Sequence, residues 1–145
     1  MYKHVLIATD GSELAAKAVT AGLELAKHLK AKATAVTATE PWAAVVTGEA
    51  ALGFPLAQYE KAAAEASAHI LSAVSDAANG RGVVCATVHA KDRYPAEGIL
   101  ETAKTNGCDL IVMASHGRRG LSRLLLGSEA VRVLTHSTVP VLICR

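Results

Sequence analysis

Aromatic side chains are scarce in this chain of 145 residues: one Trp, three Tyr and one Phe together make 3%. A core without large rings has to be packed from small aliphatic side chains, as when helices lie closely on a sheet of Val and Ile. An excess of one charge is also missing: the formal net charge is only +2, so nothing favours a nucleic-acid partner. Apolar residues make up 51% and charged residues 19%, which excludes disorder and indicates one globular domain, residues 1–145.

Long apolar runs are missing as well. No stretch approaches the roughly 20 residues of a membrane span, and the first ten residues lack a signal-peptide core, so we expect a cytoplasmic protein. The cysteines are few: Cys85, Cys108 and Cys144 have the spacing of neither a zinc knuckle nor a thioredoxin-type redox motif, so we expect buried, reduced thiols. The six histidines have no metal-ligand spacing, so the sequence predicts no metal site from protein spacing.

Short apolar, β-branched runs alternate along the chain with longer segments of helical period. Strands are predicted at residues 4–9, 33–39, 83–90, 109–114 and 139–144. Helices are predicted at residues 13–31, 58–78, 96–106 and 128–136. This order indicates an α/β fold, namely an open five-stranded parallel sheet with helices on both faces, Rossmann-like.

One connection is long for a compact domain. Residues 40–57 have no clear period, which is typical of a lid or binding loop. Trp42, near its start, either flanks a ligand pocket or anchors the segment.

Open parallel sheets bind ligands outside the carboxyl ends of their strands, where the strand order reverses. The turn after the first strand (Asp10 to Ser12) and the loop 115–128 after the fourth should meet there. Asp10 is suited to accept hydrogen bonds from a ribose or to contact Mg²⁺. The alternative is a turn former that caps the next helix. We favour the ligand role because of the position.

The loop 115–128 has a composition suited to phosphate. It contains three glycines, which let the backbone approach a ligand, and the arginines Arg118, Arg119 and Arg123, which raise the local positive potential. Gly127 and Ser128 open the last predicted helix, whose free N–H groups and dipole attract anions. The loop is neither a Walker A motif nor a dinucleotide fingerprint. From these residues alone, a phosphate site and a purely structural loop are equally supported.

Three segments together resemble the universal stress protein family: VLIATDGS at residues 5–12, CDLIVMASHG at 108–117, and the stretch from Gly127 to Leu142. The resemblance extends over the whole chain and implies the family's fold, which is like that of the adenine nucleotide α-hydrolases. The ATP-binding branch of the family carries Gly-x2-Gly-x9-Gly-Ser/Thr. Gly117, Gly127 and Ser128 match the second half, and Ala114 stands in place of the first glycine.

The resemblance implies a role for each matching residue. Gly117, Gly127 and Ser128 would hold the phosphates, Asp10 a ribose hydroxyl, and the backbone at Met113 and Ala114 would border the adenosine. The extra methyl group of Ala114 is harmless at negative φ and obstructive at positive φ. His116 has no identifiable acid partner, so loop structure or a phosphate contact is its expected role. The full predicted nucleotide site is Thr9, Asp10, Met113, Ala114, His116, Gly117, Arg118, Arg119, Gly127, Ser128 and Glu129.

The function predicted in this way is that of a regulatory stress-response protein that binds ATP, with Mg²⁺ as an accompanying ion. No catalytic residue is predicted, and any hydrolysis or autophosphorylation should be slow. The alternative is a universal stress protein that binds no nucleotide and acts as a protein-interaction module. An ATP pyrophosphatase of the α-hydrolase group is disfavoured, because its Ser-Gly-Gly-x-Asp-Ser loop is missing after the first strand.

The last predicted strand begins at Val139 and ends at Cys144, and it is apolar on both faces. In this topology it should lie at an edge of the sheet, and an exposed apolar edge favours pairing with another chain. The family resemblance also implies dimers formed through this strand. We therefore expect a homodimer that pairs there about a two-fold axis.

Overall fold

The computed structural model describes residues 1–48, 50–118, 120 and 125–145. The strands are β1 (His4–Ala8), β2 (Lys32–Thr39), β3 (Cys85–Lys91), β4 (Leu110–Ala114) and β5 (Val141–Cys144). The helices are α1 (Glu13–Leu29), α2 (Trp42–Val45), α3 (Ala50–Gly53), α4 (Leu56–Arg81), α5 (Pro95–Asn106) and α6 (Ser128–His136).

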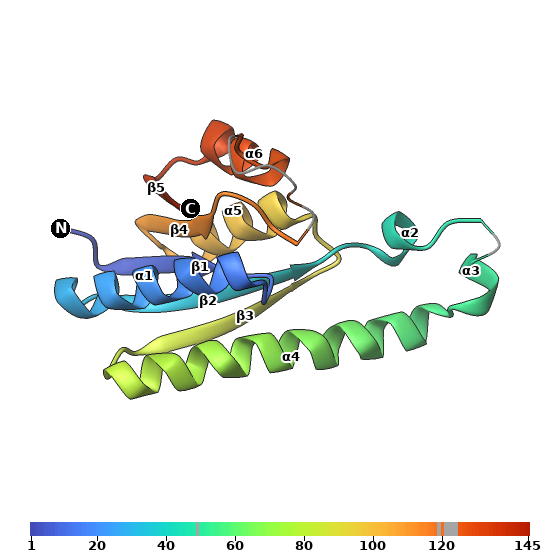
Figure 1. Ribbon diagram of the computed structural model, residues 1–145, viewed down its shortest axis with the longest axis horizontal. Helices are drawn as coiled ribbons and strands as arrows, with labels where there is room; N and C mark the ends of the chain where they lie inside the picture. Colours follow the sequence, from blue (N-terminus) through green and yellow to red (C-terminus); the bar gives the residue numbers. More distant parts are fainter. Residues whose placement is uncertain (49, 119, 121–124) are drawn as a thin grey trace.

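The five strands form one parallel sheet in the order β3-β2-β1-β4-β5, with β1 at its centre (Figure 1). Helices α1 and α4 pack on one face of the sheet, and α5 and α6 pack on the other. The strand order reverses on passing from β2 and β3, on one side of β1, to β4 and β5 on the other. The predicted α/β architecture is therefore confirmed.

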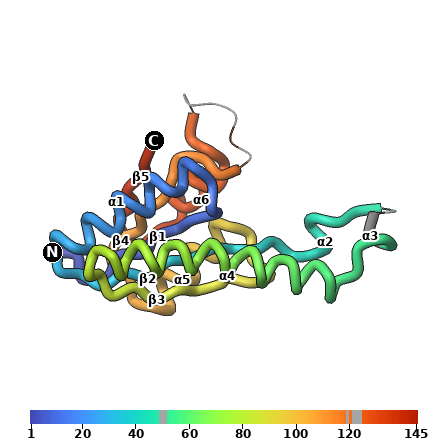
Figure 2. Tube along the Cα trace, turned by 60° about the horizontal axis from the view of Figure 1, so that its bottom comes forward, coloured from blue at the N-terminus to red at the C-terminus, as the bar shows by residue number. Residues whose placement is uncertain are grey.

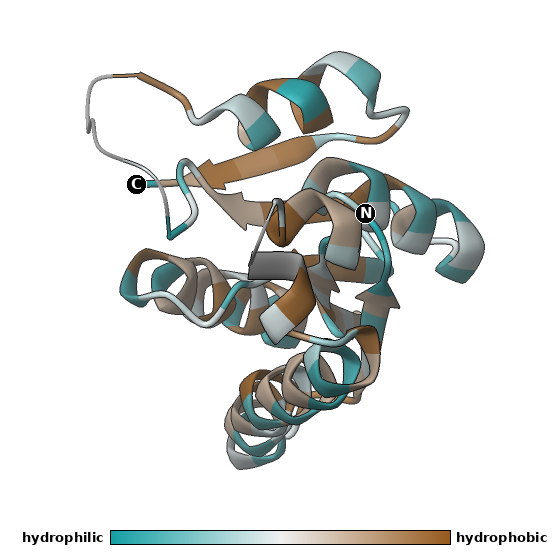
Figure 3. Cartoon of the chain, turned by 90° about the vertical axis from the view of Figure 1, so that its right-hand side faces the viewer, coloured by the Kyte–Doolittle hydropathy of each residue, from teal (hydrophilic) through white to brown (hydrophobic). Residues whose placement is uncertain are grey.

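Alternate residues of the central strand feed two separate cores, because successive side chains of a strand point to opposite faces. Val5 and Ile7 belong to the cluster under α1 and α4, whereas Leu6 and Ala8 belong to the cluster under α5 and α6. Figure 3 shows the apolar strands enclosed between helices of mixed polarity. At Gly22 of α1 a β-carbon would lie 2.7 Å from Ile7 Cγ1, so this glycine lets the helix approach the sheet closely. Small residues thus replace the missing aromatic rings.

Several element ends differ from the sequence prediction for backbone reasons. Helix α1 ends at Leu29, because Lys30 takes the left-handed conformation with φ of 53°. Helix α4 passes through Asn79 and Gly80 and ends at Arg81, because Gly82 (φ of 71°) caps it and donates its N–H to two carbonyls of the last turn. Strand β5 starts at Val141 and not at residue 139, after Pro140, which lacks an N–H group.

The connection between β2 and α4 contains regular structure. Residues 40–48 and 50–59, which we call the arm, include the short helices α2 and α3 and stand out from the sheet (Figures 1 and 2). Trp42 Nε1 donates to the carbonyl of Phe54 (2.9 Å), and the Tyr59 hydroxyl donates to the carbonyl of Glu40 (2.6 Å). The rings of Phe54 and Tyr59 meet edge to face with centroids 6.1 Å apart. Of the two roles considered for Trp42, these contacts support the anchor.

None of the helices in the described part of the chain is long and apolar enough to cross a membrane.

Candidate functional site

The loops after β1 and β4 meet at the carboxyl end of the sheet, as the sequence predicts. Asp10 joins them: its Oδ2 accepts the N–H of Arg118 (2.8 Å), and its Oδ1 accepts the N–H of Ser12 (2.9 Å). Beside it, Thr9 Oγ1 accepts the N–H of Gly11 (3.1 Å). We call the assembly of residues 9–12, 115–118 and 127–129 the loop junction.

Of the two roles considered for Asp10, the structure shows that of the turn former. Its hydrogen bonds to Ser12 and Arg118 are those of a turn former and a tether between loops. Each carboxylate oxygen has more than one acceptor site, so a hydroxyl group or a cation can still approach it. The ligand role stays a prediction.

Both motif glycines are placed where a side chain would meet neighbouring atoms. A β-carbon on Gly117 would lie 3.0 Å from Asp10 Oδ2. A β-carbon on Gly127 would lie 3.0 Å from the carbonyl oxygen of Ser115 and 3.4 Å from Cα of His116. Gly127 has φ of −64°, so close packing and not a left-handed backbone accounts for it.

The loop junction ends at the start of α6. The N–H of Gly127 donates to the Ser115 carbonyl (2.8 Å), and the N–H of Val131 donates to the Gly127 carbonyl (3.0 Å). The amides of Ser128, Glu129 and Ala130 lie between these two hydrogen bonds. Gly127, the N-cap residue, has no side chain that could accept a hydrogen bond from them. Such amides, together with the helix dipole, favour an anion.

Ala114, which replaces a motif glycine, lies in the regular strand β4. Among the described residues other than glycine, positive φ is found at Lys30 and Asp92, so Ala114 has an ordinary backbone. Ala114 and Met113 are both buried, and their side chains belong to opposite cores. The methyl group of Ala114 therefore causes no backbone strain.

The remaining residues of the predicted nucleotide site lie in different surroundings. Thr9 is buried at the end of β1, and its N–H donates to the Val36 carbonyl (3.0 Å). His116 Nδ1 lies 3.0 Å from the hydroxyl of Ser115, a contact within the loop. Arg119 and Arg123 lie outside the described residues.

Glu129 has an unexpected partner. Its Oε2 accepts the N–H of Ala96 in the first turn of α5 (2.7 Å), and its Oε1 lies 3.7 Å from Nη1 of Arg132. The sequence does not predict that Ala96 of α5 contacts the loop junction through Glu129. An acid in the first turn of a helix is common, and no spacing along the chain indicates that it reaches a different helix.

The groups with shifted pKa values lie outside the loop junction. Burial, followed by the charge of Lys32, lowers the pKa of His4, whose Nε2 lies 2.7 Å from Thr34 Oγ1. Burial, followed by the charge of Lys91, lowers the pKa of His89. Burial above all raises the pKa of Cys108 to about 11. Of the three thiols predicted to be buried, Cys108 is buried, whereas Cys85 and Cys144 are only partly buried.

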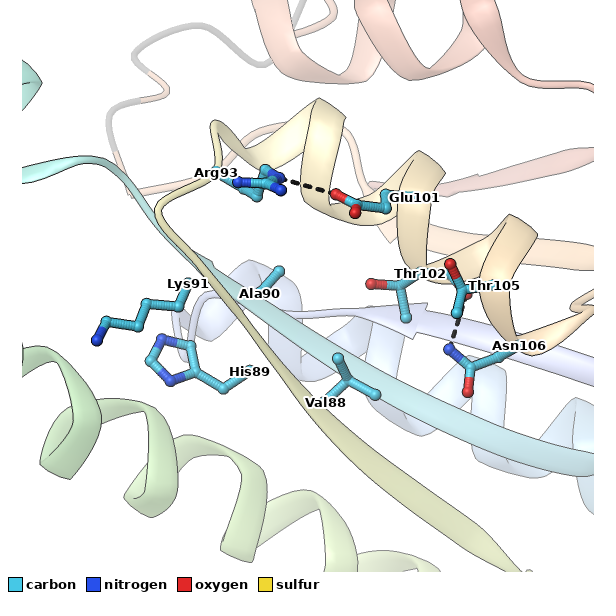
Figure 4. A pocket seen from close by; sticks show the side chains of 9 residues that line it. All are labelled: Val88, His89, Ala90, Lys91, Arg93, Glu101, Thr102, Thr105 and Asn106. Carbon is cyan, nitrogen blue, oxygen red and sulfur yellow. Dashed lines mark hydrogen bonds and ion pairs between the residues drawn. The ribbon is translucent and has the colours of Figure 1, made fainter.

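A cavity of about 270 Å³ also lies elsewhere, between β3 and α5 (Figure 4). Val88 and Ala90 of β3 point into it, and the ion pair of Arg93 with Glu101 (2.8 Å) borders it. It contains none of the predicted nucleotide-site residues. In the described part of the chain, no group of three or more His, Cys, Asp or Glu side chains is placed to hold a metal ion.

Known proteins resemble the whole chain. The model of the universal stress protein family matches residues 1–145. Universal stress protein YxiE of Bacillus subtilis is 34% identical over 151 residues, which cover all of both chains. Among solved structures, universal stress protein UspA from Lactobacillus plantarum superposes with a TM-score of 0.80 at 25% identity, covering 99% of this chain and 98% of that one. A universal stress protein in complex with cAMP superposes with a TM-score of 0.70 at 24% identity, covering 99% and 97%.

Proposed function

Because this chain belongs to the universal stress protein family, we propose that it binds an adenine nucleotide, ATP in the first place, at the loop junction. The observation that carries the proposal is the packing of the two motif glycines. Gly117 lies against the Asp10 carboxylate and Gly127 against the Ser115 carbonyl, so neither position has room for a side chain, and the first amides of α6 have no capping side chain. The solved cAMP complex supports the fold alone, so the proposal depends on this chain's own residues.

The proposed nucleotide lies across the carboxyl ends of β1 and β4. Its phosphates bind the free amides at the start of α6 and the Ser128 hydroxyl, with Arg118 supplying positive charge. Asp10 and Thr9 face the ribose and an accompanying Mg²⁺. The backbone at Met113 and Ala114 borders the adenine.

We assign this binding a regulatory role, in which nucleotide occupancy changes the affinity for a protein partner. His116 lies 3.0 Å from the Ser115 hydroxyl, but the hydrogen bonds of the described residues include none between His116 and a carboxylate that would orient it as a general base, so we assign no catalytic residue. The alternative, a protein that binds no nucleotide, had its sequence support in Ala114. The ordinary backbone of Ala114 weakens that support.

Self-association is the second part of the proposal. Strand β5 pairs with β4 on one side only and lies at the edge of the sheet. Leu142 in β5 is 41% exposed. A copy related by a two-fold axis would cover this edge, as expected for an apolar edge strand.

Calorimetric titration with ATP, ADP, AMP and GTP, with and without Mg²⁺, tests the nucleotide proposal. We expect binding of the adenine nucleotides and a higher melting temperature, because a ligand that binds only the native state stabilises it. GTP should bind more weakly. A folded protein that gives neither heat nor a thermal shift at millimolar ATP would show the proposal to be wrong.

A further inference from the structure

Glu129 lies where the N-termini of α5 and α6 come together. Its carboxylate accepts the N–H of Ala96 at 2.7 Å, while Tyr94, the N-cap residue of α5, makes no capping hydrogen bond with its side chain. The first turn of α5 is therefore capped by an acid from another helix. The contact is partly buried, and the Glu129 side chain is 33% exposed.

The same carboxylate belongs to the first turn of α6, where the proposed function places the phosphates. The start of a helix has the effect of about half a positive charge, and an acid in its first turn offsets part of it. A Glu side chain on a free surface can turn away into solvent, but the hydrogen bond to Ala96 holds this one between the two helices. Arg132 lies 3.7 Å away and its side chain is 60% exposed. Solvent therefore screens its positive charge, which offsets only part of the charge of the Glu129 carboxylate.

We infer that Glu129 is a specificity-determining residue that limits the negative charge accepted at the start of α6. The inference rests on the proposed nucleotide site and concerns which nucleotides that site prefers. A triphosphate brings more negative charge close to the carboxylate than a monophosphate does. The fixed carboxylate therefore weakens the binding of ATP more than the binding of AMP. The difference is roughly three- to tenfold at low ionic strength for charges separated by one to two helical turns.

Glu129→Gln separates the charge from the hydrogen bond, because a glutamine oxygen can still accept the N–H of Ala96. We expect the ratio of the AMP to the ATP dissociation constant to rise by roughly three- to tenfold at low ionic strength, and by less as salt is added. The matched control is Glu97→Gln, which removes the same charge from an exposed residue in the first turn of α5. In the control the ratio should stay close to that of the wild type.

The outcomes distinguish the two proposals. A wild-type chain that binds neither nucleotide refutes the proposed function, and this inference with it. If the wild-type chain binds both nucleotides and Glu129→Gln leaves the ratio of their dissociation constants unchanged, the inference is refuted and the proposed function is not.

A second variant covers the case in which Glu129→Gln does not fold. Arg132→Gln removes the positive charge that lies 3.7 Å from the carboxylate, so it must shift the ratio in the opposite direction, toward AMP. An equal change for both nucleotides in Arg132→Gln refutes the inference.

Discussion

Replacing Gly127 by valine is the most direct perturbation of the proposed phosphate site. The new β-carbon would lie 3.0 Å from the Ser115 carbonyl oxygen and 3.4 Å from Cα of His116, and these backbone atoms cannot rotate away. The backbone at Gly127 has φ of −64° and ψ of 154°, which valine adopts readily, so conformational strain adds nothing. The cost is overpacking, about 1–3 kcal/mol, or a fall in melting temperature of about 3–9 °C for a domain of this size.

The effect on binding should be larger than the effect on stability. The methyl groups of the introduced valine would stand between the phosphates and the first amides of α6. Losing two hydrogen bonds to a charged group costs about 1.5 kcal/mol or more each, which lowers the affinity for ATP by roughly a hundredfold.

Titration calorimetry of the folded variant measures this loss, and a melting curve measures stability. Gly80→Val is the matched control, because a β-carbon there meets nothing within 4 Å and the position lies in α4. A folded Gly127→Val protein with wild-type ATP affinity would show that the phosphates bind elsewhere.

Three further predictions concern stability and assembly. Leu23→Ala removes a fully buried side chain of α1 and should lower the free energy of unfolding by about 2–5 kcal/mol in urea titrations, with the slope m unchanged. The folded state holds the pKa of His4 and His89 below the usual 6.5, mainly through burial, so the unfolded chain takes up protons first. Stability should therefore be complete above pH 6.5 and fall as the pH drops below it; a flat profile between pH 7.5 and 5.5 in chemical denaturation would contradict this. Light scattering at micromolar concentration should report about twice the chain mass, and Leu142→Lys should lower it; a monomeric wild type at high concentration would refute pairing through β5.

The sequence predicts the sheet and the meeting of the two loops because both depend on local patterns. Apolar runs of strand length and Gly or Asp at their ends are visible within a few residues of each other. The strand order then follows from right-handed crossovers, which leave few alternatives.

What could not be predicted depends on contacts between distant residues. The hydrogen bond from the Ala96 N–H to Glu129 joins residues that are 33 positions apart in two helices, and no periodicity in the sequence indicates it. The sequence predicts too early an end for α4, because Asn79 and Gly80 are poor helix formers, whereas the helix stops only where Gly82 takes a positive φ. In the arm, Pro and Gly interrupt the helical pattern, so the sequence does not predict the short helices there. Aromatic contacts hold this segment in place.

The arm also determines what an optical experiment on this protein would observe. Trp42 is the single tryptophan, and it lies in the arm, hydrogen-bonded to Phe54, and not in either core. Intrinsic fluorescence therefore reports the detachment of a peripheral segment, whereas circular dichroism reports the sheet and its helices. Because peripheral segments open at lower free energy than cores, the two signals should give separate midpoints. A fluorescence melt alone would describe the arm and underestimate the stability of the domain.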